Sequence, residues 1–169
     1  MLKSSIAFII GLCPLTAIAD TLNFTNTRYG LGLNLPYSVD GMALNWSRLG
    51  WDWDADGAWF KLVGPDVEVL TFGRYHNAES WANSIRDTRS LLQGDGYTIE
   101  VEQLGENEVT LLGSFDEDRL FAWRSVLAHD CDGNDIVVSV RIEYARSEGW
   151  FGEYIPAVLE SLRGCGLGD

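Results

Sequence analysis

Basic residues are scarce in this chain. Its 169 residues include 12 Lys and Arg against 25 Asp and Glu, which gives a formal net charge of -13. Nucleic acids and anionic membrane surfaces recruit proteins through Lys and Arg, so the charge argues against both. It permits a basic partner or a cation, and solubility alone is the alternative explanation. Hydrophobic residues make up 46% of the chain and aromatic residues 12%, so the scarcity of basic residues does not indicate disorder.

Residues that carry enzymatic chemistry are also few. The two histidines, His76 and His129, are far apart in sequence, and neither lies at a metal-ligand spacing. No Gly-x-Ser-x-Gly motif and no nucleophilic cysteine context accompanies them. The sequence therefore predicts a protein that is not an enzyme.

The segment before Asp20 has the pattern of a cleavable export signal. Lys3 precedes the apolar run Ile6–Leu12, and Ala17–Ala19 is a small-x-small cleavage site. The run is much shorter than the roughly 20 residues that a membrane span needs, and no later segment is apolar enough to span. Cys13 lies inside the apolar region behind Leu12, which argues against lipid attachment. We expect residues 1–19 to be a signal peptide and the mature protein to be periplasmic or secreted.

Cysteine is rare, and the count becomes even once the signal peptide is removed. Cys13 leaves with the signal, so Cys131 and Cys165 remain. A pair of cysteines in an oxidising compartment predicts a disulfide, and a redox-active pair is a poor alternative because there is no Cys-x-x-Cys motif. The bond would tie the C-terminal tail to a hairpin and contribute roughly 3 to 4 kcal/mol.

The remaining 20–169 region has the length and composition of one domain. Alternating or continuous apolar runs predict strands over Leu22–Leu35 (one strand or a pair), Met42–Trp53, Trp59–Val63, Val67–Phe72, Tyr97–Val101, Glu108–Leu112, Leu120–His129 and Ile136–Ala145. A helical period follows Asn77, a good N-cap, and ends at Gly94 and Gly96; a second helix is predicted over Tyr154–Arg163. This order predicts a single α+β domain, a mainly antiparallel β-sheet with flanking helices.

Four segments of the chain resemble a known family. They are Tyr29–Pro36 (YGLGLNLP), Ala78–Trp81 (AESW), the strand that contains Gly113, and Phe151–Leu162 (FGEYIPAVLESL). Together they resemble the PsbP-like α/β/α sandwich family. The resemblance implies the sandwich fold and a role among accessory and binding proteins of exported compartments more than among enzymes. It implies no catalytic residues.

The segment Asp52–Gly57 matches the first half of a calcium-binding loop. Asp52, Asp54 and Asp56 alternate ahead of Gly57, as in an Asp-x-Asp-x-Asp-Gly motif whose carboxylates converge on the ion. The twelfth position of such a loop is Val63 instead of the bidentate Glu. We expect no cofactor, with calcium at these three aspartates as the alternative to a solvated hairpin tip.

Seven tryptophans are many for this length. Trp46, Trp81 and Trp123 fall on the apolar sides of their elements and are predicted to lie in the core. The other four, which we expect to be exposed and to contact a partner, are Trp51, Trp53, Trp59 and Trp150.

These features lead to one main hypothesis and two alternatives. The main one is an exported, non-enzymatic accessory or binding protein that presents an acidic, Trp-bearing face to a protein partner. The first alternative is a periplasmic immunity or inhibitor protein that neutralises a basic toxin or hydrolase. The second is a calcium-assisted glycan-binding module that uses Asp52–Gly57.

Overall fold

A single antiparallel sheet organises the molecule. The computed structural model describes residues 21–49 and 56–165, and within them seven strands pair in the order β5-β6-β7-β11-β10-β9-β8. Their bounds are β5 Trp46–Leu49, β6 Gly57–Leu62, β7 Val67–Tyr75, β8 Tyr97–Leu104, β9 Glu108–Phe115, β10 Arg119–His129 and β11 Asp135–Ala145. The sheet confirms the predicted fold class.

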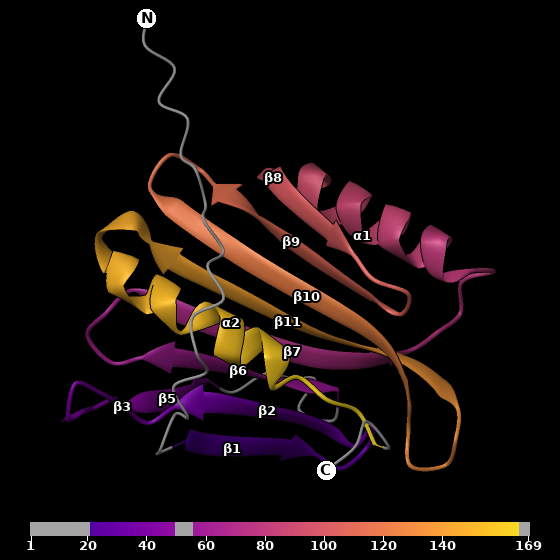
Figure 1. The fold of residues 1–169 in the computed structure, drawn as a ribbon, viewed down its shortest axis with the longest axis horizontal. Helices are drawn as coiled ribbons and strands as arrows, with labels where there is room; N and C mark the ends of the chain where they lie inside the picture. Colours follow the sequence, from indigo (N-terminus) through magenta and orange to yellow (C-terminus); the bar gives the residue numbers. More distant parts are fainter. Residues whose placement is uncertain (1–20, 50–55, 166–169) are drawn as a thin grey trace, which may run out of the picture.

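The two faces of the sheet are covered by different elements (Figure 1). One face carries the hairpin β1 (Thr21–Asn26) and β2 (Leu31–Pro36) together with the short helix α2 (Ile155–Glu160). The other face carries α1 (Trp81–Gly94), which lies beside β8. A 3-10 segment, η1 (Arg146–Glu153), leads into α2, and a small hairpin of β3 (Ser38–Val39) and β4 (Met42–Ala43) follows β2.

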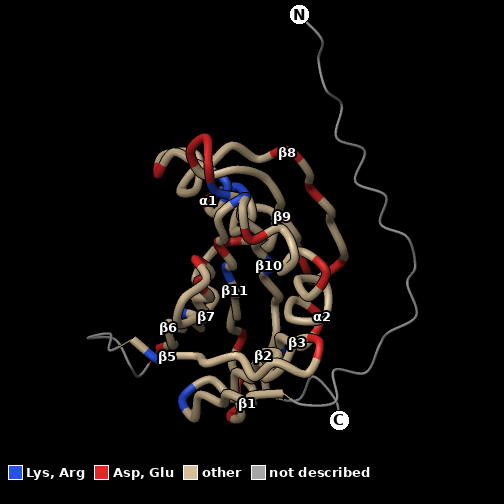
Figure 2. The backbone as a smooth tube through the Cα atoms, turned by 90° about the vertical axis from the view of Figure 1, so that its left-hand side faces the viewer, with Lys and Arg blue, Asp and Glu red and all other residues tan. Residues whose placement is uncertain are grey.

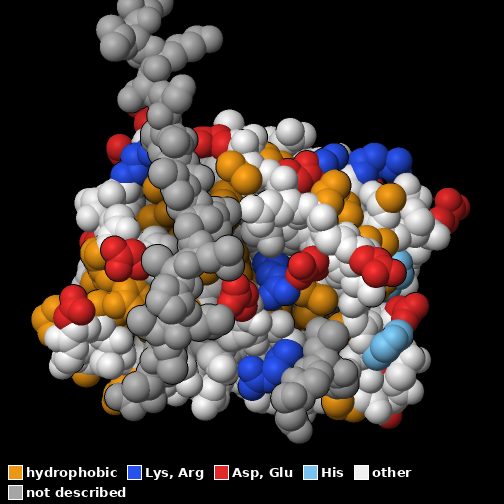
Figure 3. Space-filling model, viewed as in Figure 1, with side chains coloured by type: hydrophobic (Ala, Val, Ile, Leu, Met, Phe, Trp, Pro, Cys, Tyr) orange, Lys and Arg blue, Asp and Glu red, His pale blue; other side chains and the backbone are white. Residues whose placement is uncertain are grey.

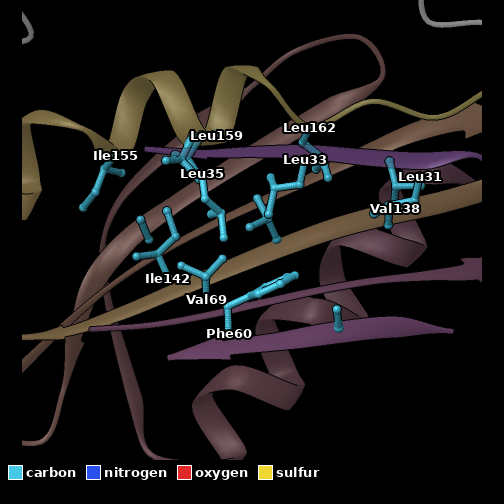
Figure 4. Close-up of a cluster of buried hydrophobic side chains, with 14 of the residues drawn as sticks. Leu31, Leu33, Leu35, Phe60, Val69, Val138, Ile142, Ile155, Leu159 and Leu162 are labelled. Atoms are coloured by element: carbon cyan, nitrogen blue, oxygen red, sulfur yellow. The ribbon is translucent and has the colours of Figure 1, made fainter. Parts of the chain in front are cut away.

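The larger core lies between the sheet and the β1–β2 hairpin. Leu31, Leu33 and Leu35 alternate along β2, are fully buried, and point at the sheet and α2 (Figure 4). Period-two alternation in β6 and β7 supplies the opposing side chains, such as Phe60 and Val69. This burial holds the hairpin onto the sheet as a third layer with α2.

The smaller core lies under α1. Leu92 of α1 packs with Trp123 and four other buried side chains of β8, β9 and β10, and Trp81 and Phe72 pack against their edge. Trp123 is therefore in the core as predicted, while Trp46 and Trp81 are only partly buried against the two cores.

A disulfide links the β10–β11 turn to the C-terminal tail, and the β1–β2 turn packs against it. Cys131, in the turn between β10 and β11, bonds to Cys165 of the C-terminal tail, which confirms the predicted pairing and its role as a staple. Gly30 of the β1–β2 turn packs against the bond, since a Cβ atom there would lie 2.5 Å from the Cβ of Cys165. The tail also pairs with β2, through Gly32 N donating to the Arg163 carbonyl at 2.8 Å and Arg163 N donating to the Gly32 carbonyl at 3.0 Å.

Three boundaries differ from the sequence prediction. The first helix begins after Ser80 instead of Asn77, because the Ser80 hydroxyl accepts a hydrogen bond from Asn83 N and caps the first turn. The last helix is shorter than Tyr154–Arg163, because Arg163 is drawn into the pairing with Gly32. The predicted strand Met42–Trp53 is divided into β4 and β5, and its last residues, with the predicted signal peptide, lie outside the described ranges.

Candidate functional site

A groove of about 500 Å³ opens at the end of the molecule that carries β3 and β4. Its apolar lining includes Met42, Leu44, Val63, Pro65 and Trp150, and we call it the Trp150 groove. In Figure 3, hydrophobic side chains gather at this end with acidic side chains among them. The groove is thus both apolar and open to solvent.

Two hairpin turns place the exposed side chains Met42 and Val63 of the groove. Asp40 and Gly41 both have positive φ (51° and 78°), as a type I′ hairpin turn requires, and Val39 pairs with Met42 across it. Met42 therefore lies at the hairpin tip, where it is 68% exposed. Val63, at the start of the β6–β7 turn, is 59% exposed.

Trp150 forms the back wall of the groove. Its Nε1 donates to Oε2 of Glu148 at 2.6 Å, and its ring meets Phe151 edge-on with centroids 5.5 Å apart. Phe151 is fully buried in the larger core. Trp150 is therefore held in one orientation by a rigid neighbour, with part of its ring left to the groove.

Acidic groups lie in the groove and near it. Asp40 lines it, Glu148 binds Trp150, and Glu153 lies close to Tyr154. The pKa of Tyr154 is raised, first by burial and then by the negative charges of Asp40 and Glu153. None of the described lining residues is Lys or Arg. Figure 2 shows Asp and Glu distributed around the whole backbone, which adds a long-range negative field to this local one.

The two predicted partner-binding tryptophans that the structure describes, Trp59 and Trp150, lie on opposite faces of the sheet. Trp59 lies in β6 between Ala58 and Phe60, which point into the larger core, so its side chain points to the opposite, α1 side of the sheet. Trp150 packs on the larger-core side. Trp51 and Trp53 fall outside the described ranges. Of the two that the structure describes, Trp150 belongs to the groove and Trp59 does not.

Of the three candidate calcium ligands, Asp56 lies within the described residues. Asp56 forms an ion pair of 2.5 Å with Arg28 and accepts a hydrogen bond of 3.3 Å from the Tyr29 hydroxyl. Burial, and next the charge of Asp56, raise the pKa of Tyr29. Asp52 and Asp54 lie outside the described residues, and no cluster of three His, Cys, Asp or Glu side chains suited to a metal ion occurs among the residues that are described.

The groups that could have suggested catalysis are separated or already paired. Nδ1 of His129 lies 3.0 Å from a carboxylate oxygen of Asp135 at an exposed hairpin end. The Ser125 hydroxyl is buried, accepts a hydrogen bond from Trp123 Nε1 at 2.7 Å, and lies 2.8 Å from the Ser139 hydroxyl. Ser125 therefore belongs to a buried polar pair between strands and is not free as a nucleophile.

Comparison with known proteins identifies a fold relative. The crystal structure of LpqN, involved in cell envelope biogenesis of Mycobacterium tuberculosis, aligns with a TM-score of 0.54. The chains share a fold. The alignment covers 86% of this chain and 90% of LpqN at 13% sequence identity. No family model and no curated protein sequence matches the chain, so membership of the PsbP-like family stays a prediction. None of the helices within the described ranges is long and apolar enough to cross a membrane.

Sequence reasoning did not find most of the groove. Its residues come from β3, β4, the β6–β7 turn and η1, which no linear motif connects. One local signal was present, because Asp40-Gly41 between Val39 and Met42 is typical of a two-residue hairpin. That signal predicts an exposed methionine at the tip but not what lies beside it.

Proposed function

We propose that this chain is an exported, non-enzymatic binding protein that holds a basic segment of a protein partner in the Trp150 groove. The observation that carries the proposal is the exposure of Met42 and Val63 around one rigid tryptophan. Contiguous exposed hydrophobic side chains with a polar rim mark interaction sites on soluble proteins. Tryptophan is also the residue type most enriched among the side chains that dominate binding energy.

Charge supports the basic character of the partner. Asp40 lines the groove, Glu148 binds its Trp150, and the whole chain carries a net charge of -13. Such a field attracts a cationic partner and repels an acidic one, and it acts mostly on the association rate. An apolar side chain flanked by Lys or Arg is the segment that fits both the groove and its rim.

The compartment has independent support. The Cys131–Cys165 disulfide is typical of proteins that fold in an oxidising environment. LpqN, which shares the fold, is involved in cell envelope biogenesis. Both observations support a place in the cell envelope for a protein with the predicted export signal.

The test is a pull-down from envelope extract with protein purified after export of the full chain. Met42→Asp and Val63→Asp would each place a charge in the groove and, because both side chains are exposed, leave the fold intact. The matched control is Leu104→Asp, since Leu104 is 61% exposed on β8, outside the groove. A partner that is lost from both groove variants and kept by the control supports the proposal; a partner kept by all three contradicts it.

The same experiment separates an accessory protein from an inhibitor. If the captured partner is a hydrolase or toxin, its activity is measured with and without the purified protein. Inhibition that disappears with Met42→Asp assigns the inhibitor role to the groove. Unchanged activity of the bound partner supports the accessory role.

A further inference from the structure

A second, separate hollow lies on the opposite side of the sheet, between α1 and strands β7, β10 and β11. It has a volume of about 450 Å³, and its lining is mostly apolar, with Leu70, Phe72, Leu91 and Trp123 contributing. We call it the α1 cleft. Volumes of 300 to 1,000 Å³ with an apolar lining and few polar groups are usual for small-molecule sites.

The floor of the cleft is rigid. Leu70, Arg141 and Trp123 are direct cross-strand neighbours on β7, β11 and β10. The Phe72 and Trp123 rings meet edge-on with centroids 5.6 Å apart, and Trp123 Nε1 is occupied by Ser125. Trp123 therefore offers the cleft an aromatic surface, not a hydrogen-bond donor.

The wall of the cleft is one side of α1, and it is left open. Leu91, near the end of the helix, is 59% exposed although it lines an apolar hollow. In Figure 1, α1 lies over the β8 side of the sheet and does not extend across β7. An apolar molecule in the cleft would therefore cover side chains that the fold itself does not cover.

One end of the cleft carries a cation without an acidic partner. Arg74 lines both the α1 cleft and an adjoining hollow of about 300 Å³ that also contains His76 and Ser84. Its guanidinium donates a long hydrogen bond, 3.4 Å, to the Ser84 hydroxyl, and no Asp or Glu oxygen of the described chain lies within ion-pair distance. Arg141, by contrast, pairs with Glu143 at 2.9 Å.

A second polar group at the same end also lacks a partner. The Nδ1 atom of His76 is buried and forms no hydrogen bond within the described structure. Buried polar atoms in native proteins nearly always have a hydrogen-bond partner, so His76 Nδ1 and Arg74 are two polar groups of one hollow that a bound molecule could engage. The acidic groups that face this region are Asp87 in the adjoining hollow, Asp95 in the α1 cleft, and Asp56, which is neutralised by Arg28.

We infer that the α1 cleft binds a small amphipathic organic anion, with its apolar body against Leu70, Phe72 and Trp123 and its anionic group at Arg74. Asp95 follows the last residue of α1, whereas Ser84, which hydrogen-bonds Arg74, is in the first turn, so Asp95 and the Arg74 contact are separated along the helix by roughly 16 Å. The anionic group lies at Arg74, which has no ion pair within the described chain, and away from Asp95, which would repel it. Arginine also provides the paired donors that a carboxylate or sulfonate accepts.

Two dyes of nearly the same shape test this inference. Anilinonaphthalene sulfonate carries an anionic group, and N-phenylnaphthylamine is its uncharged counterpart. Fluorescence titration of the exported, purified protein measures the affinity of each. The inference predicts saturable binding of one anionic dye per chain and weaker binding of the neutral dye.

Two variants and two controls locate the site. Arg74→Gln is expected to lower the affinity for the anionic dye about tenfold, the effect of losing a charge-assisted contact. It should leave the affinity for the neutral dye unchanged. Leu91→Ser is expected to lower the affinity for both dyes. The controls are Arg86→Gln, an exposed arginine of α1 outside the cleft, and Leu104→Ser, an exposed leucine of β8; neither should change the binding of either dye.

Three results would overturn the inference. One is the absence of saturable binding, and another is binding that Arg74→Gln and Leu91→Ser leave unchanged. The third is equal affinity for the two dyes, which would contradict the anionic class of ligand. None of these results bears on the Trp150 groove, because the variants that test the groove lie on the other side of the sheet.

Discussion

The hydroxyl of Tyr97 on β8 donates a hydrogen bond to Oε1 of Glu143 on β11, a carboxylate that is only 8% exposed. Arg141 Nε lies 2.9 Å from the same oxygen in an ion pair, and Arg119 Nε lies 3.8 Å from the other carboxylate oxygen. Two cations and a phenol thus stabilise one buried negative charge beneath α1. Removing one partner from such a charge is costly, because the carboxylate stays buried.

Tyr97→Phe is predicted to destabilise the protein by about 1 to 3 kcal/mol, the usual effect of leaving a buried acceptor short of a partner. Tyr37→Phe is the control, because Tyr37 is 52% exposed. Urea unfolding of the two variants measures the difference. Equal stability of wild type and Tyr97→Phe would show that the hydrogen bond is not formed in solution.

The same residue predicts a pH dependence. Burial, and next the hydrogen bond to Glu143, raise the pKa of Tyr97 above its ordinary value of about 10. A group whose pKa is raised by folding stabilises the protein fully below the unfolded pKa and loses that contribution as pH rises through the folded pKa. Stability should therefore fall above about pH 10 in the wild type and fall less in Tyr97→Phe. An identical alkaline decline in both proteins would contradict this assignment.

Gly30→Ala and Gly41→Ala form a matched pair that tests the disulfide junction. Both glycines have positive φ (62° and 78°), so both substitutions introduce backbone strain of roughly 1 to 2 kcal/mol. A Cβ at Gly30 would also lie 2.5 Å from Cys165 Cβ and 2.9 Å from Cys131 Sγ, whereas nothing lies within 4 Å at Gly41. Gly30→Ala should lower the melting temperature distinctly more than Gly41→Ala. Equal shifts would mean that the turn is not packed against the disulfide.

The disulfide itself is predicted to stabilise the fold by roughly 3 to 4 kcal/mol, mainly by restricting the unfolded chain. A Cys131→Ser, Cys165→Ser double variant should lose this contribution and should no longer respond to reductant. Calorimetry with and without reductant measures both effects. A wild-type melting temperature that reductant does not change, with free thiols detected beforehand, would contradict the bond.

Calcium is predicted not to stabilise the protein, because Asp56 is engaged by Arg28 and Tyr29. The check is the melting temperature in EDTA and in excess calcium, repeated with Asp52, Asp54 and Asp56 changed together to Asn. A calcium-dependent increase that the triple variant abolishes would revive the glycan-binding alternative.

Elements with a local sequence signal could be predicted, whereas features that depend on tertiary packing were harder to predict. Strands such as Leu120–His129 were predictable because alternation and β-branched residues are local signals, and the disulfide was predictable because two of the three cysteines lie beyond the predicted signal peptide. The start of α1 was less predictable, because Asn77 and Ser80 are both good N-caps and only tertiary packing selects between them.

The site was the least predictable part. Trp59 and Trp150 are equally suggestive in the sequence, but their sides of the sheet depend on the register of β6 and on the path of η1. Met42 and Val63 carry no binding motif, and only the folded chain places them beside Trp150. The unpaired state of Arg74 likewise depends on which carboxylates the fold brings near it.

Site-specific photo-crosslinking can show directly whether a protein partner lies in the Trp150 groove. A photoreactive amino acid is placed at Met42 or, as the control, at Leu104, and the exported protein is irradiated in intact cells. We expect one crosslinked basic protein from position 42, in an amount that raised salt reduces, and none from position 104. The same product from both positions, or none from position 42, would contradict a partner in the Trp150 groove.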